Sequence, residues 1–400
     1  MRSRCQELLH RQKLSQENSL AHFMDLLEHE FGIQSQLFSH SLLAIQCRLQ
    51  SKVSLNEIKS LMEDEKKIIR TWSLRGTLHL MRTADAAVMW SAFGTEWTTR
   101  WGTYLKQHVT EYDKQLVSEA VLSSLSDGPK TREQLKADLN ASLKCETALI
   151  DYLLSPWGGI LKDLSYKRMV IHGNPLEPDI AFHLTSSWLQ GQPDIYHMYD
   201  QEEALGLILL RYLQAYGPAR AEDFAYWSGI TVTLAKKILK NSSADLISIG
   251  DLYDNKNIYR TNSTEAIPAV KLLPKFDPLL LGHKEKFYME SEYYKKIYGA
   301  AGHVHAAVLI NGMIAGTWKV KGKRVPVWRG RWRLAGRAQP RSRENSLFFQ
   351  SKLPAASCRR LTLIPCVPSL YENAAADRRR SFPGNEAHRD MTVNLSMQGA

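Results

Sequence analysis

Apolar residues recur at helical spacing along most of the first 240 residues of the chain. The pattern predicts two short helices within residues 7–27 and a further helix whose inner stripe lies within residues 37–49. Ser54 and Glu57 match a capping box, and they predict the start of another helix. Residues 68–80 alternate between apolar and polar positions, which predicts a β-hairpin.

Two later stretches repeat one order of elements: an amphipathic helix, a turn with a Gly-Pro pair, two more helices and a pair of strands. The first stretch has helices at 116–125, 132–139 and 147–154 and strands at 160–164 and 169–172; the second has helices at 204–216, 221–228 and 232–239 and strands at 246–249 and 257–261. This is the order of a winged helix, so we predict two such units. The first 110 residues have room for a third.

Strand patterns replace helical ones beyond residue 266. A predicted strand over residues 269–274 runs into Pro274 and Pro278, which fix a rigid turn. Strands at 303–309 and 313–320 flank Asn311-Gly312, a strong hairpin signal.

These patterns predict a mostly helical α+β protein, built from tandem winged-helix repeats with a C-terminal β-rich region. The predicted division is an N-terminal winged-helix-like domain over 1–110, a second winged helix over 111–200, a third over 201–265, a β-hairpin region over 266–320 and an Arg-rich tail over 321–400.

The composition is that of an ordinary globular protein: 400 residues with 44% hydrophobic residues suffice for two or three domains. No apolar run is long enough to span a bilayer, and the N-terminus lacks the apolar core of a signal peptide. We therefore expect a cytoplasmic protein with no membrane partner. The five cysteines have no close-spaced metal or disulfide pattern, and we expect neither a metal nor another cofactor.

The formal net charge of +11 is concentrated at the C-terminal end. Residues 321–400 contain 16 basic and 5 acidic residues, which leaves 36 of each in the first 320. The body is therefore formally neutral, and the net charge gives no support to nucleic-acid binding there.

The Arg-rich tail has three competing interpretations. It contains 13 Arg and 3 Lys, whereas Lys outnumbers Arg in the body, and it shows no helical or strand periodicity. It is a basic disordered segment that grips phosphates, a disordered segment with no role, or the out-of-frame translation of what should be further domain. We favour the third because the exchange of Lys for Arg suggests a change of codon register.

Two glutamines one residue apart, Gln34 and Gln36, are the first candidates for chemistry. On a regular helix their side chains would point in opposite directions, so a joint role predicts that residues 32–36 are not helical, with a kink at Gly32. The alternative is a pair of solvated glutamines at a helix start. Serine-hydrolase, metalloprotease, Walker and Rossmann motifs are missing from the sequence.

The predicted hairpin at 68–80 contains Arg75, Thr77 and His79 around a glycine. A cation, a hydroxyl and an imidazole together offer donors to a phosphate oxygen, so these residues are candidates for DNA binding. The alternative is an ordinary set of outward polar side chains. We expect the tryptophans on the helices to lie in the core. Polar residues 98–100 lie between Trp97 and Trp101, which leaves room for one of these two rings to be exposed.

Five stretches together resemble the winged-helix DNA glycosylase family of AlkZ and YcaQ type over about residues 7–320. They are the QxQ at Gln34 and Gln36, TWSLRGTLHL at 71–80, GPARAEDFAYWSGI at 217–230, LLPKFDPLLLG at 272–282 and NGMIAGTW at 311–318. The resemblance implies three tandem winged helices around a channel for duplex DNA, release of N7-alkylated purines and, in some members, unhooking of interstrand crosslinks.

The family's catalytic pair matches Gln34 and Gln36. An N7-alkylated purine is cationic and already a good leaving group, so two amide oxygens that hold a water suffice. No lysine lies beside the pair in the sequence, which favours hydrolysis without a Schiff base, that is, a monofunctional glycosylase. The resemblance further implies a monomer that encloses double-stranded DNA. Two alternatives are open: a non-catalytic winged-helix DNA-binding protein such as a transcription regulator, and an inactive product.

Overall fold

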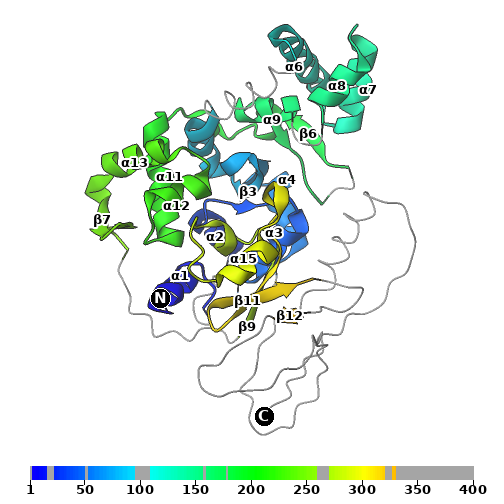
Figure 1. The fold of residues 1–400 in the computed structure, drawn as a ribbon. Coiled ribbons are helices and arrows are strands. Elements are labelled where there is room, and N and C mark those ends of the chain that lie inside the picture. The colour runs from blue at the N-terminus through cyan, green and yellow to red at the C-terminus, as the bar shows by residue number, and fades with distance from the viewer. Residues whose placement is uncertain are drawn as a thin grey trace.

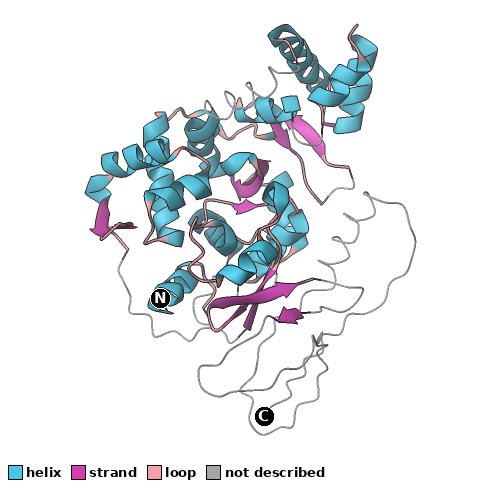
Figure 2. Ribbon diagram, viewed as in Figure 1, coloured by secondary structure: helices cyan, strands magenta, loops and turns pink. Residues whose placement is uncertain are grey.

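Helices dominate the computed structural model, and short antiparallel strands lie between them (Figure 2). The structure describes residues 2–15, 22–49, 53–94, 109–155, 159–176, 179–258, 270–319 and 327–329.

The α-helices are α1 (Arg2–Arg11), α2 (Phe23–His29), α3 (Phe38–Gln46), α4 (Leu55–Glu63), α6 (Glu111–Ser126), α7 (Arg132–Ser142), α8 (Thr147–Leu153), α9 (Gly159–Tyr166), α10 (Thr185–Trp188), α11 (Gln201–Tyr216), α12 (Ala221–Ser228), α13 (Val232–Asn241), α14 (Pro278–Leu281) and α15 (Ser291–Ile297). Residues 86–94 are also helical. Single turns of 3-10 helix are η1 (Leu74–Gly76), η2 (Thr83–Asp85), η3 (Pro193–Tyr196), η4 (Ser243–Asp245) and η5 (Ala300–Gly302). Helices α6, α7 and α8 project together at one end of the molecule (Figure 1).

The strands are β1 (Ile33–Gln34), β2 (Ile68–Trp72), β3 (Leu78–Arg82), β4 (Lys130–Thr131), β5 (Val170–His172), β6 (Ala181–Leu184), β7 (Leu246–Ile249), β8 (Leu252–Asn255), β9 (Val270–Leu273), β10 (Ala307–Ile310), β11 (Met313–Trp318) and β12 (Val327–Arg329). They form a six-stranded sheet in the order β1-β3-β2-β5-β6-β4, a four-stranded sheet in the order β12-β11-β10-β9 and the hairpin β7-β8. The six-stranded sheet therefore joins strands from the predicted 1–110 and 111–200 ranges.

Local sequence explains where several helices begin. Thr110 and Thr131 each accept a hydrogen bond from the third helical residue, whose own side chain returns a bond, so both α6 and α7 begin with complete capping boxes. The Ser54 hydroxyl caps α4 by accepting from the Glu57 amide at 3.2 Å. These bonds satisfy amide groups that a helix start leaves without partners.

The two hairpins predicted most directly are confirmed. Strands β2 and β3 pair through η1, and β10 and β11 pair across Asn311 and Gly312, whose φ angles of 48° and 83° fit the mirror-image turn that Asn-Gly favours. The predicted helices also match α6 to α8 and α11 to α13, with α12 at its predicted bounds.

Two predicted strands are wrong. Residues 160–164 lie in helix α9, whose apolar residues Ile160, Leu161 and Leu164 are spaced for one helical face, and β5 pairs with β6 instead. In the second stretch, β7 pairs with Leu252–Asn255 rather than residues 257–261, because Gly250 (φ 63°) and Asp251 close a tight turn directly after β7. Residues 259–261 lie outside the described part.

One strand lies within the predicted tail. Val327–Arg329 pairs with β11, opposite Gly316, Thr317 and Trp318. Three residues are too few to show an alternating pattern, so this strand could not be predicted from the sequence. Residues 320–326 and 330–400 are outside the described part, and the three interpretations of the tail stay predictions.

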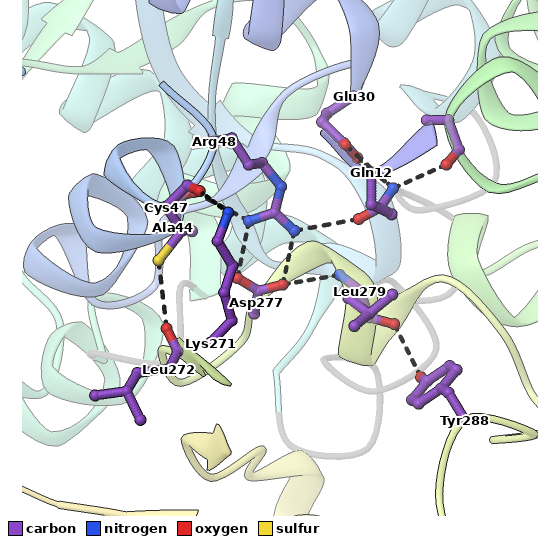
Figure 3. A network of polar contacts seen from close by, with 11 residues as sticks. Gln12, Glu30, Ala44, Cys47, Arg48, Lys271, Leu272, Asp277, Leu279 and Tyr288 are labelled. Carbon is purple, nitrogen blue, oxygen red and sulfur yellow. Dashed lines mark hydrogen bonds and ion pairs between the residues drawn. The ribbon is translucent and has the colours of Figure 1, made fainter. Parts of the chain in front are cut away.

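The N-terminal helix and the C-terminal sheet share one hydrophobic core. Leu8, Leu9 and Leu14 pack with Leu273 of β9 and Leu309 of β10, all at most 2% exposed. A second, larger core surrounds α11 and continues through α6 to α9. Between the N-terminal helices and the C-terminal region, Arg48 and Asp277 form a buried ion pair within a polar network (Figure 3). None of the helices in the described ranges is long and apolar enough to cross a membrane.

Candidate active site

A sharp kink before β1 sets the direction of the glutamine segment. Gly32 has a φ of +90°, and a Cβ there would lie 3.0 Å from the Met81 Cβ and 3.1 Å from the Leu80 carbonyl oxygen. Glycine is therefore required both by the backbone conformation and by the close approach of β3. The predicted non-helical kink is confirmed, since Ile33 and Gln34 are a strand paired with β3.

Gln34 and Gln36 have different surroundings. Gln34 is buried, and its Oε1 accepts a hydrogen bond of 2.9 Å from Arg75 Nη2. Gln36 is exposed, and its Oε1 accepts from the amide of Leu78 at 3.3 Å, next to the end of β1. Each amide oxygen has two lone pairs, so each can accept one further hydrogen bond from a water.

The residue between them is fixed from three sides. The Ser35 amide donates to the Leu78 carbonyl at 2.6 Å, and its carbonyl accepts from Arg70 Nε and Nη2 at 3.2 and 2.9 Å. Its hydroxyl lies 3.2 Å from that of Ser41. The backbone that carries the two glutamines is therefore held in one position.

Arg75 links the glutamine segment to a distant helix. It lies in η1 with a φ of 56°, a conformation that costs a non-glycine residue about 1 kcal/mol or more. Besides Gln34, it donates through Nη1 to the carbonyl of Trp227 in α12. No carboxylate pairs with this guanidinium in the described part of the chain, and burial lowers its pKa from the ordinary value.

His79 lies directly across from Gln34 in the β1–β3 pair and from Thr71 in the β2–β3 pair, so the three residues share one face of the sheet. Its side chain is 2% exposed. Burial, and to a lesser extent the charge of Arg75, lower the pKa of His79 to about 3, so the ring is neutral at ordinary pH.

The structure brings four of the five predicted site residues together: Gln34, Gln36, Arg75 and His79 lie around the β1–β3 pair. The fifth, Thr77, turns its hydroxyl to the Leu74 carbonyl at 3.1 Å. Contact of Arg75, Thr77 and His79 with DNA stays a prediction.

The surroundings of Arg75 are rich in phenol groups and poor in acidic ones. Tyr166, Tyr216 and Tyr226 are near enough to interact with its charge, and burial raises the pKa of each, so all three are neutral. Lys286, whose pKa burial lowers to about 7, also interacts with Arg75. The site thus combines neutral hydrogen-bonding groups with a concentrated positive charge.

Sequence reasoning missed the bond from Arg75 to Gln34 and the contribution of Trp227. No periodic signal links these residues, because Gln34 and Arg75 are 41 residues apart in the chain and Arg75 and Trp227 are 152 apart. The predicted core role of the tryptophans is confirmed for Trp72, Trp90 and Trp227, which are at most 4% exposed. Trp97, Trp101, Trp157 and residues 98–100 lie outside the described residues.

In the described part of the chain, no group of three or more His, Cys, Asp or Glu side chains could hold a metal ion. The residues around Gln34 offer neutral acceptors for a water beside the positive charge of Arg75. Such a site fits a reaction whose leaving group needs no strong acid.

Three comparisons relate the chain to known proteins. A family model described as DNA glycosylase AlkZ-like matches residues 27–340. An interstrand DNA cross-link repair glycosylase from Streptomyces sahachiroi is 28% identical over 305 residues, which are 72% of this chain and 80% of that protein. The match to the solved structure of Streptomyces sahachiroi DNA glycosylase AlkZ covers 83% of this chain and 92% of that chain, with 24% sequence identity. The TM-score of 0.71 shows a shared fold. Since the family model spans well over half of its residues, the chain belongs to the AlkZ-like family of DNA glycosylases.

Proposed function

We propose that this DNA glycosylase hydrolyses the N-glycosidic bond of N7-alkylated purines in duplex DNA and that it unhooks interstrand crosslinks made through such purines. Support comes from the family match over residues 27–340, from the cross-link repair glycosylase that it resembles, and above all from the buried amide of Gln34, held by Arg75.

The reaction suits two amides. Alkylation at N7 gives the purine a positive charge, so the base leaves as a neutral molecule when the C1′–N9 bond breaks. The enzyme then has to place a water below C1′ and stabilise an oxocarbenium-like sugar. Gln34 and Gln36 place this water with the lone pairs that Arg75 and the Leu78 amide leave free.

Arg75 is a positioning residue in this scheme. An amide side chain can turn over and exchange its oxygen for its NH₂ group. A guanidinium can only donate, so the bond at 2.9 Å keeps the Gln34 oxygen on one side. The second bond of Arg75, to the Trp227 carbonyl, fixes the guanidinium against α12.

The arrangement of helices supports the finer description of the fold. We propose two winged-helix units: α6 to α8 with β5–β6, and α11 to α13 with β7–β8. They lie in domains over 111–200 and 201–265. An N-terminal domain over 1–110 precedes these two domains, and the β-rich region over 266–320 follows them. Such tandem units would enclose duplex DNA as a monomer, whereas a regulator reads spaced half-sites as a dimer.

A release assay tests the proposed function. Duplex DNA that carries N7-methylguanine or a nitrogen-mustard crosslink is incubated with the full chain and treated with alkali, which cuts the strand at each abasic site. We expect release by the wild type and a loss of about 100-fold in Gln34→Ala and in Gln36→Ala, the typical cost of one deleted polar group that stabilises a transition state.

The control is Gln115→Ala, because Gln115 is an exposed glutamine whose side-chain amide donates to Glu119 on α6. Its release rate should equal that of the wild type. Equal release by the Gln34→Ala/Gln36→Ala double variant would exclude the assigned roles. Duplex binding without release by the wild type would instead indicate the non-catalytic DNA-binding protein.

A further inference from the structure

The imidazole of His79 has a fixed tautomer. Its Nδ1 lies 3.0 Å from the carbonyl oxygen of Thr77. A carbonyl oxygen only accepts hydrogen bonds, so Nδ1 carries the proton of the neutral ring. The other nitrogen, Nε2, must then hold a lone pair.

That lone pair is available beside Gln34. Among the described residues, Nε2 makes no hydrogen bond. It also does not belong to the fully buried polar atoms that lack a partner, so a small part of it faces solvent. His79 and Gln34 are direct cross-strand neighbours, which places their Cβ atoms about 5 Å apart on the same face of the sheet. A water held by the Gln34 amide is therefore within reach of the imidazole.

The charged group that acts on His79 is Arg75, a cation that pairs with no carboxylate in the described ranges. Burial, and to a lesser extent the field of Arg75, keep the ring from taking up a proton from solvent, so that Nε2 stays an acceptor. The neighbouring polar groups on the same face are neutral: the Gln34 amide and the hydroxyl of Thr71, which bonds to Ser165.

We propose that His79 is a further catalytic residue, whose Nε2 accepts the proton of the attacking water. This proposal rests on the proposed function. The water oxygen bonds to C1′ as the C1′–N9 bond breaks, and the pair of electrons from that bond neutralises the cationic purine. One proton of the water passes to Nε2 and from there to solvent.

The weak basicity of His79 is sufficient for this step. Once its oxygen is bonded to C1′, the water is an oxonium, which is a far stronger acid than any imidazolium. Amide oxygens can orient the water but cannot take up the proton at ordinary pH. A weakly basic imidazole accepts it and releases it to solvent at once, ready for the next turnover.

The test is a set of single-turnover measurements on duplex DNA with N7-methylguanine, made with the full chain. In His79→Asn the side-chain amide still reaches the Thr77 carbonyl, because it lies near the position of Nδ1, while the acceptor at Nε2 is lost. We expect the rate at saturating enzyme to fall about 100-fold, with the Kd for DNA unchanged. Added imidazole should restore part of the rate in His79→Asn and His79→Ala.

His183→Asn is the matched control, since His183 is a partly buried histidine of β6 in the same sheet. It should keep the wild-type rate and not respond to imidazole. A His79→Asn protein that melts with the wild type and keeps its rate would overturn the proposal. So would a weaker Kd with an unchanged saturated rate, which would make His79 a DNA contact, or a slow variant that imidazole does not rescue. An inactive wild type would instead refute the proposed function.

Discussion

Arg48 and Arg75 both place a guanidinium inside the protein, but among the residues that the structure describes only Arg48 pairs with a carboxylate. Arg48 is fully buried and makes two bonds to Asp277, Nη1 to Oδ2 at 2.9 Å and Nη2 to Oδ1 at 2.8 Å (Figure 3). It also donates to the Ala44 carbonyl and to Gln12. Within the described residues, Arg75 donates to two neutral oxygens, those of Gln34 and Trp227, and it has a positive φ.

The difference shows what each charge does. The carboxylate of Asp277 offsets the cost of burying Arg48, and together they join α3 to the segment before α14. The charge of Arg75 is not neutralised by a described carboxylate, so its field acts on Gln34 and His79. The balanced pair joins two segments of the fold, whereas the unbalanced and strained cation lies at the candidate site, where such strain tends to be found.

The largest effect should follow from breaking the balanced pair. In Asp277→Asn the charge of Arg48 stays buried without its paired carboxylate, and we expect the free energy of unfolding to fall by about 3–5 kcal/mol. Urea denaturation followed by circular dichroism measures this loss. The control is Asp251→Asn, which breaks the exposed pair with Arg220 and should leave the unfolding curve nearly unchanged. Equal curves for the two variants would contradict the structural role of the Arg48–Asp277 pair.

A smaller effect, on catalysis rather than stability, should follow from removing the unbalanced cation. We expect Arg75→Met to slow single-turnover release about 100-fold, or about 2.7 kcal/mol, because the Gln34 amide loses its fixed orientation. The loss of stability should stay well below that of Asp277→Asn, since no carboxylate is left without a partner. Arg168→Met, which removes a bond to the Ser91 hydroxyl, serves as the arginine control.

A double-mutant cycle separates this role from a general structural one. If Arg75 acts through Gln34, Arg75→Met should slow the Gln34→Ala variant no further. Additive losses would show that Arg75 contributes by another route, such as direct contact with the phosphate backbone.

The smallest expected effect is a flat pH profile. The pKa of His79 is lowered to about 3, so its Nε2 keeps the lone pair throughout the range above about pH 4, and acid removes it only below that. Single-turnover release at saturating enzyme should therefore change less than twofold between pH 5 and 8. An ordinary imidazole, with a pKa near 6.5, would instead make the rate rise more than tenfold over this range. Such a rise would contradict the influence of Arg75 and burial on this ring.

Most helices and two hairpins of this fold could be predicted because their signals are local. The Asn311-Gly312 turn and the capping residue Ser54 act on backbone groups within a few positions. The failures have a local cause too. Residues 160–164 are apolar enough for a buried strand or a buried helix, and a run this short does not distinguish them.

For the candidate site, the sequence by itself determined the kink at Gly32, the amide pair that follows it and the hairpin that contains Arg75 and His79. Side-chain alternation on a strand fixes such features among neighbours. Only the tertiary structure decided that Arg75 holds Gln34 and reaches α12. It also decided that Arg48 pairs with Asp277, which is 229 residues away in the chain, whereas Arg75 pairs with no carboxylate among the described residues. The reason is physical: periodicity records which face of an element is apolar, but the partner of a buried charge depends on how the elements pack, which no single stretch of the chain specifies.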